Sequence, residues 1–263
     1  MASTAQPTST SLPKGVAPLR AGAGNSFLWR RLHSLSGIVP VGLFLLEHFL
    51  SNSEAINGVA AYNAQVKFLT GLPFRLALEI FGIFIPLAFH ALYGVYIWWR
   101  GDNNVIDYPW TGNWFYTAQR YTGLVVFAYV TFHLWTMRFT GIHLTEHADA
   151  SFWKVQHELS NPLVLAFYVV GILAASWHLG YGCFLFAAKW GIVTGDKARK
   201  RAQGVGIALS VLLVLAGIMS VYAFVGKYQT QQFDPTWEQP SSDSAPADQS
   251  RVIPSSVPSS QAR

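Results

Sequence analysis

Charged residues are scarce in this sequence. They account for 12% of its 263 residues, whereas hydrophobic residues account for 51% and aromatic residues for 15%. Ordinary soluble domains contain about 25% charged residues. The shortage of charge therefore argues against a soluble globular protein and indicates an integral membrane protein.

Cysteine is almost absent, since Cys183 is the single one in the chain. One cysteine can form neither a disulfide within the chain nor a cysteine metal cluster. The sequence also lacks CxxCH, which excludes covalent attachment of a c-type haem. It contains neither GxxxxGK[ST] nor GxGxxG, which argues against a nucleotide or flavin site in this chain.

Long apolar segments dominate the rest of the sequence. A bilayer core of about 30 Å is crossed by roughly 20 mostly apolar residues in a helix, because only a helix or a closed barrel satisfies its own backbone hydrogen bonds in lipid. The segments are too long and too uniform for barrel strands. We predict an all-α bundle of five transmembrane helices at about 32–51, 74–99, 117–138, 161–189 and 204–226.

The regions outside these spans have different compositions. Residues 1–26 lack an apolar core followed by a cleavage site, so we expect a flexible extension and no cleaved signal peptide. Residues 227–263 are rich in Ser, Pro, Gln and Ala and are predicted to be disordered, which leaves 27–226 as the membrane domain. The connector 51–73 is either a simple loop or a short amphipathic helix, with Val59, Tyr62, Val66 and Leu69 on one face.

Lysine and arginine are unevenly distributed between the two sides of the predicted bundle. One side carries 11 of them, and the opposite short loops carry only Lys67, Arg75, Arg138 and Lys154. Because basic residues near span ends stay in the cytoplasm, we expect a cytoplasmic N-terminus and an outside C-terminus. The basic loop "GDKARKRAQG" would then face the cytoplasm, where it suits anionic lipid or an acidic partner.

Four of the eight histidines fall in four successive predicted spans. They are His48, His90, His133 and His178, at separations of 42, 43 and 45 residues. Each lies about 16 residues from the start of its span, or roughly 24 Å at 1.5 Å per residue. Because adjacent spans run in opposite directions, His48 and His133 share the outer half, while His90 and His178 share the inner half.

Two histidine pairs at different depths suit two flat macrocycles held one above the other. Neutral imidazole binds haem iron, and two axial nitrogens leave no open position for oxygen, which points to electron transfer. Zinc and copper prefer compact sites of three or four ligands. The pattern therefore predicts two non-covalent b-type haems, and the alternative is a haem-free anchor or transporter whose histidines relay protons.

Other residues near the histidines are candidates for supporting roles. Glycines within three turns of the ligands, Gly37, Gly94 and Gly123 among them, would let a porphyrin approach the backbone, although glycine also serves helix packing. Haem propionates need cationic or hydrogen-bonding partners, and the cytoplasmic ends offer Arg30, Arg31, His33, Ser34 and Lys189. Glu47 is a candidate for proton exchange with a quinone, and its alternative is a water-facing carboxylate at the membrane edge.

Several stretches resemble one known family. They are "FLWRRLHSLSGIVPVGLFLLEHF", "LPFRLALEIFGIFIPLAFHALYGVY", "QRYTGL", "FHLW", "FYVVGI" and "WHLGYG". Together they are similar to the diheme cytochrome b membrane subunit of bacterial succinate dehydrogenases and fumarate reductases, from about Phe27 to Gly226. Glu47 stands where close relatives are expected to have glutamine.

The resemblance implies a distal haem on His48 and His133 and a proximal haem on His90 and His178. It further implies a bacterial cytoplasmic membrane, a flavoprotein subunit that oxidises succinate, and an iron–sulfur subunit at the cytoplasmic face of this chain. Electrons would pass to a quinone, expected to be menaquinone, near the outer side, and the succinate site would lie in another subunit. The alternative is a diheme cytochrome b of a hydrogenase or formate dehydrogenase, although the basic inner face favours a cytoplasmic partner.

Overall fold

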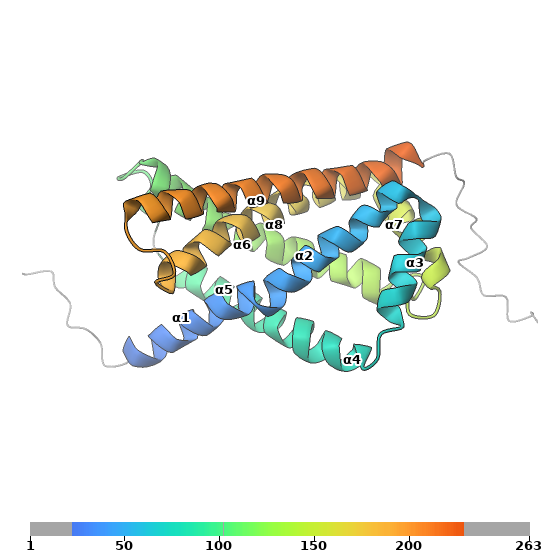
Figure 1. The fold of residues 1–263 in the computed structure, drawn as a ribbon, viewed down its shortest axis with the longest axis horizontal. Coiled ribbons are helices and arrows are strands. Elements are labelled where there is room, and N and C mark those ends of the chain that lie inside the picture. The colour runs from blue at the N-terminus through green and yellow to red at the C-terminus, as the bar shows by residue number, and fades with distance from the viewer. Residues whose placement is uncertain (1–22, 102, 229–263) are drawn as a thin grey trace, which may run out of the picture.

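A computed structural model describes residues 23–101 and 103–228, which form helices and connecting turns (Figure 1). No strand occurs in these two ranges. The all-α prediction is confirmed for this part of the chain. The predictions for the two termini fall almost entirely on residues 1–22 and 229–263, which lie outside the described residues.

Nine α-helices follow one another in the described ranges. Their bounds are α1 Ala23–Ile38, α2 Pro40–Ser53, α3 Val59–Thr70, α4 Arg75–Ala77, α5 Ile85–Arg100, α6 Thr111–Leu134, α7 Ser151–Ser160, α8 Pro162–Lys189 and α9 Asp196–Tyr222. Three π-helical stretches extend them at Leu78–Phe84, Trp135–Phe139 and Ala223–Lys227. Short 3₁₀ turns lie at Glu54–Asn57 and Ala148–Ala150.

Local sequence signals explain several helix boundaries. Pro40 lacks an N–H group and begins α2, so α1 and α2 form one interrupted run instead of a single regular helix. The side chain of Asn161 caps α8 by accepting hydrogen bonds from the N–H groups of Leu163 and Val164, and Pro162 occupies the first helical turn. Such a start fixes where the fourth predicted span begins.

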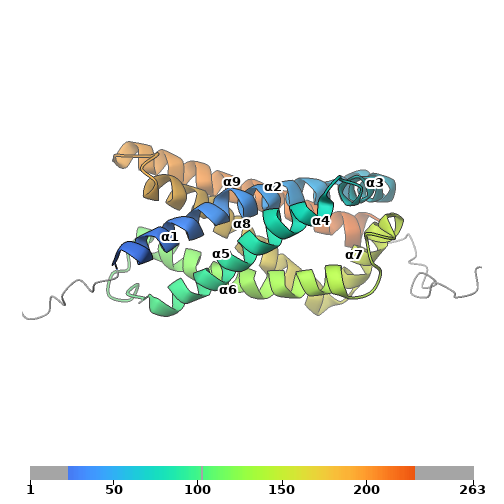
Figure 2. The ribbon, with the colours of Figure 1, turned by 90° about the horizontal axis from the view of Figure 1, so that it is seen from below.

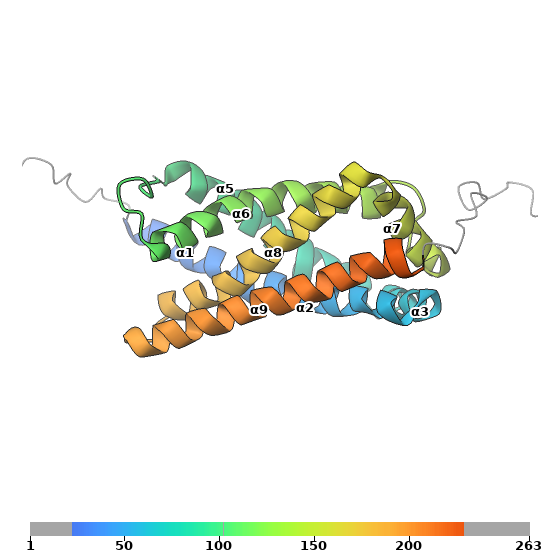
Figure 3. The same cartoon turned by 90° about the horizontal axis from the view of Figure 1, so that it is seen from above.

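The long helices run along one axis, while α3 and α7 lie together at one end of it (Figures 1 and 2). Helix α8 packs against α9, α6 and α1, and α2 packs against α9 (Figure 3). Close approach of α8 and α9 depends on small residues, because a Cβ on Gly206 would collide with the backbone of Gly180. The described N-terminal and C-terminal ends lie at opposite ends of the bundle.

Within the described ranges, four helical runs are long and apolar enough to cross a membrane. They are Ser26–Asn57, Arg75–Arg100, Pro162–Lys189 and Asp196–Lys227. Helix α6 has 24 residues, a sufficient length, but polar residues such as Gln119 and Arg120 make it less apolar than these four. The fifth span therefore stays a prediction, as does the orientation of the bundle.

A hydrophobic cluster joins α3, α7 and the end of α9. Phe152 and Phe224 are fully buried in it, and Tyr62 packs against both rings. Burial raises the pKa of the Tyr62 hydroxyl, which stays protonated and donates to Asn52. Val59 and Val66 also contact this cluster, so the helical alternative for the connector is correct. Helix α7 was not anticipated from the sequence.

Candidate functional site

His48 of α2 and His133 of α6 lie together toward the end of the bundle that carries α3 and α7. Their ring centroids are 5.6 Å apart, and the rings stand at 74° to each other. We call these residues the outer pair. These two residues are 85 positions apart in the sequence, and they meet as their equal depths in the predicted spans indicate.

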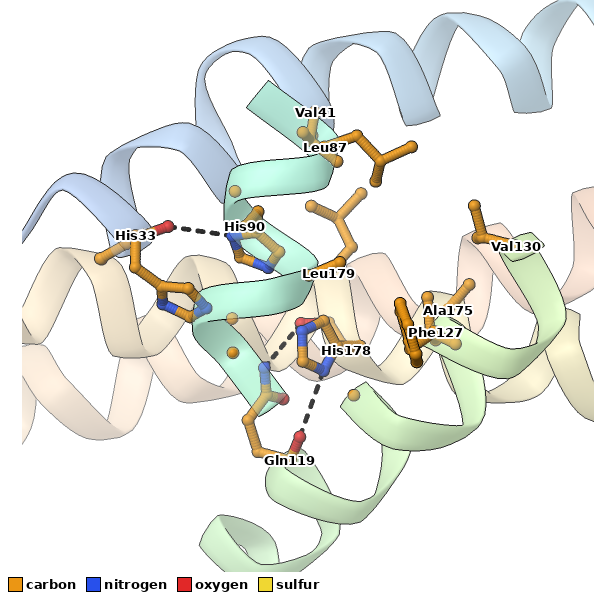
Figure 4. Close-up of a pocket in the computed structure, with 18 of the residues that line it drawn as sticks. His33, Val41, Leu87, His90, Gln119, Phe127, Val130, Ala175, His178 and Leu179 are labelled. Carbon is orange, nitrogen blue, oxygen red and sulfur yellow. Dashed lines mark hydrogen bonds between the residues drawn. The ribbon is translucent and has the colours of Figure 1, made fainter. Parts of the chain in front are cut away.

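His90 of α5 and His178 of α8 form the inner pair. Their ring centroids are 6.2 Å apart at an interplanar angle of 80°. Figure 4 shows the two rings approaching one another from opposite walls of a cavity. The ring of His33 stacks on that of His90, with centroids 4.2 Å apart, so three imidazoles gather at this level instead of two.

The ring separations can be compared with those needed to hold one iron between two imidazoles. Metal–nitrogen bonds of about 2 Å on opposite faces would put the ring centres about 6 Å apart. The observed 5.6 and 6.2 Å match this separation. Both pairs therefore fit the donor set and the spacing of a bis-imidazole haem site.

Hydrogen bonds select the tautomer of the inner pair. Nδ1 of His90 lies 3.0 Å from the carbonyl oxygen of His33, and Nδ1 of His178 lies 3.2 Å from that of Gln119 (Figure 4). A carbonyl oxygen only accepts, so Nδ1 carries the proton in both rings. The lone pair of each Nε2 is then available for a metal, and the second bond fixes the ring orientation.

The outer pair has different polar neighbours. Nδ1 of His133 lies 3.2 Å from the hydroxyl oxygen of Tyr168, which again leaves Nε2 for a ligand. For His48 the neighbour lies at the opposite nitrogen, because the Asn52 amide is 3.3 Å from Nε2. The same amide donates to the His48 carbonyl at 2.8 Å, so it retains a partner if Nε2 binds a metal.

Three of the glycines picked out from the sequence face the histidines. A Cβ on Gly37 would overlap the His90 ring, and a Cβ on Gly123 would lie 3.0 Å from Cε1 of His178. A Cβ on Gly94 would lie 3.1 Å from Nε2 of His33. The imidazole rings at this level therefore have room only because these three positions are glycines.

A cavity of about 900 Å³ occupies the centre of the bundle. Its walls come from α1, α2, α5, α6 and α8, and its lining is mostly apolar. It contacts Arg30 and Lys189 at one end, passes His90 and His178, and reaches Leu134 and Trp135 beside the outer pair. Such a volume is large for a ligand pocket, typically about 300–1,000 Å³.

Four of the five propionate candidates lie around this cavity. Its lining includes Arg30, His33, Ser34 and Lys189. Arg31 does not line it, because its guanidinium lies over the rings of Phe27 and Trp190, 4.9 and 5.1 Å from their centroids. Nζ of Lys189 donates to the Arg30 carbonyl at 3.0 Å, which ties α8 to α1 at the cavity end.

Glu47 does not line the cavity. Its carboxylate accepts a hydrogen bond from Ser51, whose hydroxyl oxygen accepts one from Gln65 at 3.0 Å. The structure also contains a carboxylate that the sequence reasoning missed. Glu79 lies inside the second predicted span and pairs with Arg75 and Arg138. The sequence could have indicated Glu79, because an ionisable residue within a predicted span is itself a functional candidate.

Comparison with known proteins identifies the family. No family model matches the chain. The chain is 40% identical over 204 residues to the succinate dehydrogenase cytochrome b558 subunit of Bacillus subtilis, which covers 77% of this chain and 100% of that protein. This chain belongs to the succinate dehydrogenase cytochrome b558 subunit family. It is also 27% identical to the fumarate reductase cytochrome b subunit of Wolinella succinogenes, over 74% of this chain and 80% of that protein.

Membership in the cytochrome b558 subunit family agrees with the helical runs described above. Four runs suit a membrane, and the family is one of membrane subunits of quinone oxidoreductases. The chain is therefore a multi-pass membrane protein and a membrane-anchor cytochrome b subunit.

Proposed function

We propose that this chain carries electrons from the cytoplasmic side of a bacterial inner membrane to a membrane quinone, as the cytochrome b subunit of a succinate dehydrogenase. The outer pair would hold one b-type haem and the inner pair another. The observation that carries this proposal is the pairing of four histidines at 5.6 and 6.2 Å in two places along one bundle. Such a haem, held by both imidazoles of a pair, would supply one-electron transfer and would leave no iron position open to oxygen.

The protein side of this function can be assigned to named groups. Carbonyls of His33 and Gln119 orient the inner imidazoles, and the hydroxyl of Tyr168 orients His133. Arg30, Ser34 and Lys189 are the candidate propionate partners at the inner end of the cavity. The lining of the cavity is mostly apolar, and an apolar surrounding strengthens the electrostatic interactions inside it.

The proposal includes five spans. Helix α5 ends at the same end of the bundle at which α6 begins, and α8 begins at the opposite end (Figures 1 and 3). Helix α6 thus runs the length of the bundle beside α8, against which it packs. Its polar residues face protein, since Gln119 bonds His178 of α8 and Arg120 donates to the carbonyls of Trp98 and Gly101. The basic loop after α8 then faces the cytoplasm.

The names of the relatives support the proposed partner subunits. A succinate dehydrogenase subunit implies a flavoprotein subunit and an iron–sulfur subunit at the cytoplasmic face. We infer menaquinone as the acceptor near the outer pair, with Glu47 exchanging protons with it. Exchange of Glu47 for Gln should then slow quinone reduction while leaving the haem content unchanged.

One experiment tests the haem assignment. The complex is purified, and the reduced-minus-oxidised absorption spectrum and the ratio of haem to protein are measured before and after addition of succinate. We expect two b-type haems per chain, reduced by succinate. The variants His48→Ala and His133→Ala should lose the same haem, and His90→Ala and His178→Ala the other. His143→Ala, which changes an exposed histidine outside both pairs, is the matched control.

Three results would contradict the proposal. Absence of b-type bands from the wild-type complex would favour a haem-free anchor or transporter. Loss of different haems from the two members of one pair would overturn the pairing. The haems could instead accept electrons from a hydrogenase or formate dehydrogenase and not from succinate. That result would assign the chain to another oxidoreductase.

A further inference from the structure

Three charged side chains meet where the second helical run begins and α6 ends. Nη1 of Arg75 lies 2.6 Å from Oε1 of Glu79, and Nη2 of Arg138 lies 2.9 Å from Oε2 of the same carboxylate. We call these three residues the outer arginine cluster. Two guanidinium groups share one carboxylate, so the cluster has a net charge of +1.

The cluster is partly withdrawn from solvent. The side chains of Arg75, Glu79 and Arg138 are 26%, 20% and 33% exposed. Glu79 and Arg138 also lie in two different π-helical stretches, Leu78–Phe84 and Trp135–Phe139. Stretches of π-helix are rare and frequent at functional sites, and ionisable groups at membrane depth are costly. Both features indicate a role beyond surface solubility.

The same two stretches border the central cavity beside the outer pair. Phe84, five residues after Glu79, lines the cavity, as do Trp135 and Phe139 on either side of Arg138. The stretch Leu78–Phe84 also packs against α2, which carries His48. His133 precedes Arg138 by only five residues on the same helical run, which places Arg138 about one turn beyond the outer pair.

A b-type haem at the outer pair would bring two propionate carboxylates that need partners. A carboxylate withdrawn from water requires cationic or hydrogen-bonding neighbours. The candidates Arg30, Ser34 and Lys189 line the opposite end of the cavity, near the inner pair. Partners for the outer propionates must therefore come from other residues.

The other basic residues at the outer end have different roles in the described ranges. Nζ of Lys154 lies 2.7 to 3.0 Å from the carbonyl oxygens of Met137, Thr140 and Ile142, which takes all three of its donors. Nζ of Lys227 donates to the Ile56 carbonyl at 2.8 Å. Lys67 is exposed on α3. Arg75 and Arg138 are the basic residues that combine excess positive charge with a position beside the cavity.

We propose that the outer arginine cluster is an anion site in which Arg138 binds a propionate carboxylate of the outer haem. This inference rests on the proposed haem function. A guanidinium group has five N–H donors in a planar fork, so Arg138 can bind Glu79 and a second carboxylate together. Glu79 then holds the guanidinium in place, and Arg75 offsets the charge of Glu79.

The proposal predicts shifts of opposite sign for two charge changes. A positive charge near the iron favours its reduced form, and a negative charge favours its oxidised form. Arg138→Gln should therefore lower the reduction potential of the outer haem, and Glu79→Gln should raise it. The potential of the inner haem should stay at its wild-type value in both variants.

The measurement is a redox titration of the purified complex followed by absorbance. The outer haem is identified as the component that His133→Ala lacks. Arg138→Lys keeps the charge and should shift the potential less than Arg138→Gln. Lys67→Gln is the control, because it removes an exposed charge from the same end of the protein and should shift neither haem.

Several outcomes decide the matter. Arg138→Gln can fail to accumulate or can lose haem. The potential of the outer haem in Glu79→Gln then tests the proposal alone, because this variant retains both arginines. The reduction potential of the outer haem could stay unchanged in Glu79→Gln, or both haems could shift equally. Either result would mean that the cluster is only an ion pair at the membrane interface. A wild-type complex without two haems would contradict the proposed function, whereas two haems with unshifted potentials would contradict this inference only.

Discussion

The hydroxyl oxygen of Tyr168 lies 3.2 Å from Nδ1 of His133, and this contact links α8 to α6 at the outer pair. Tyr168 is 5% exposed, so no water can readily replace it. Removal of an outer-shell partner of a metal ligand typically costs about 10–100-fold in metal affinity. Tyr168→Phe should therefore weaken haem retention at the outer pair by roughly this factor.

The check for Tyr168→Phe is the haem content after dilution and after incubation with a haem-binding competitor. Tyr222→Phe removes the hydroxyl of an exposed tyrosine and should behave like the wild type. Equal loss of both haems in Tyr168→Phe would mean that the hydroxyl supports the whole bundle and not His133 in particular.

Gly37 makes room for the inner pair. A Cβ at this position would overlap the imidazole of His90, and that ring cannot retreat because its Nδ1 is bonded to the His33 carbonyl. Gly37→Ala should thus lose the inner haem and keep the outer one. Gly204→Ala is the control, since it adds a methyl group to a helix with nothing within 4 Å.

Spectra of both glycine variants give the answer, because each of the two proposed haems would contribute separately to the reduced absorption. Alanine improves helix propensity over glycine by about 1 kcal/mol, so neither variant should fail through helix propensity. Retention of both haems in Gly37→Ala would show that His90 has more freedom than its hydrogen bond suggests.

The histidine pairs could be predicted from the sequence because their depth depends only on span direction and on the rise per residue. The partners of these histidines could not. Tyr168 and Gln119 reach an imidazole of another helix only at particular rotations and crossing angles of the helices, which packing sets and sequence spacing does not. Asn52 is the exception, because it lies four residues after His48 on the same helix.

Glu79 and α7 were missed for other reasons. Glu79 lies in a segment whose apolar composition dominated the prediction, and its partner Arg138 comes from another helix 59 residues away. Helix α7 has ten residues and a polar face, so it resembles a loop until Phe152 and Leu159 are seen buried in a cluster with α3 and the stretch Ala223–Lys227 that extends α9. Both features depend on contacts between distant segments.

Lys154 fixes the end of α6. It is 5% exposed and donates to three carbonyl oxygens, one within the stretch Trp135–Phe139 and two just beyond it. Burial lowers the pKa of Lys154, and the nearby Glu158 carboxylate opposes this shift. Lys154→Met would leave buried carbonyls without a donor, at about 1–3 kcal/mol for each one that water cannot reach.

We therefore expect Lys154→Met to lower the thermal stability of the complex and to loosen the outer haem before the inner one. Thermal unfolding in detergent, followed at the absorption of each haem, measures both effects. Lys67→Met removes an exposed lysine from α3 and should change neither. Coincident loss of the two haems at the wild-type temperature would show that the Lys154 contacts are dispensable.

The span count rests on α6, which is less apolar than its neighbours, and labelling of single cysteines can settle it. Cys183 is first replaced by Ser, and a cysteine is introduced at Asp107 before α6 or at Thr145 after it, both exposed positions. If α6 spans the membrane, a membrane-impermeant maleimide added to intact spheroplasts should label Thr145→Cys and leave Asp107→Cys unlabelled. Inside-out vesicles should show the reverse.

Labelling of both positions from one side would mean that α6 does not cross the membrane. Exchange of the two labelling patterns would mean that the orientation inferred from the basic residues is inverted.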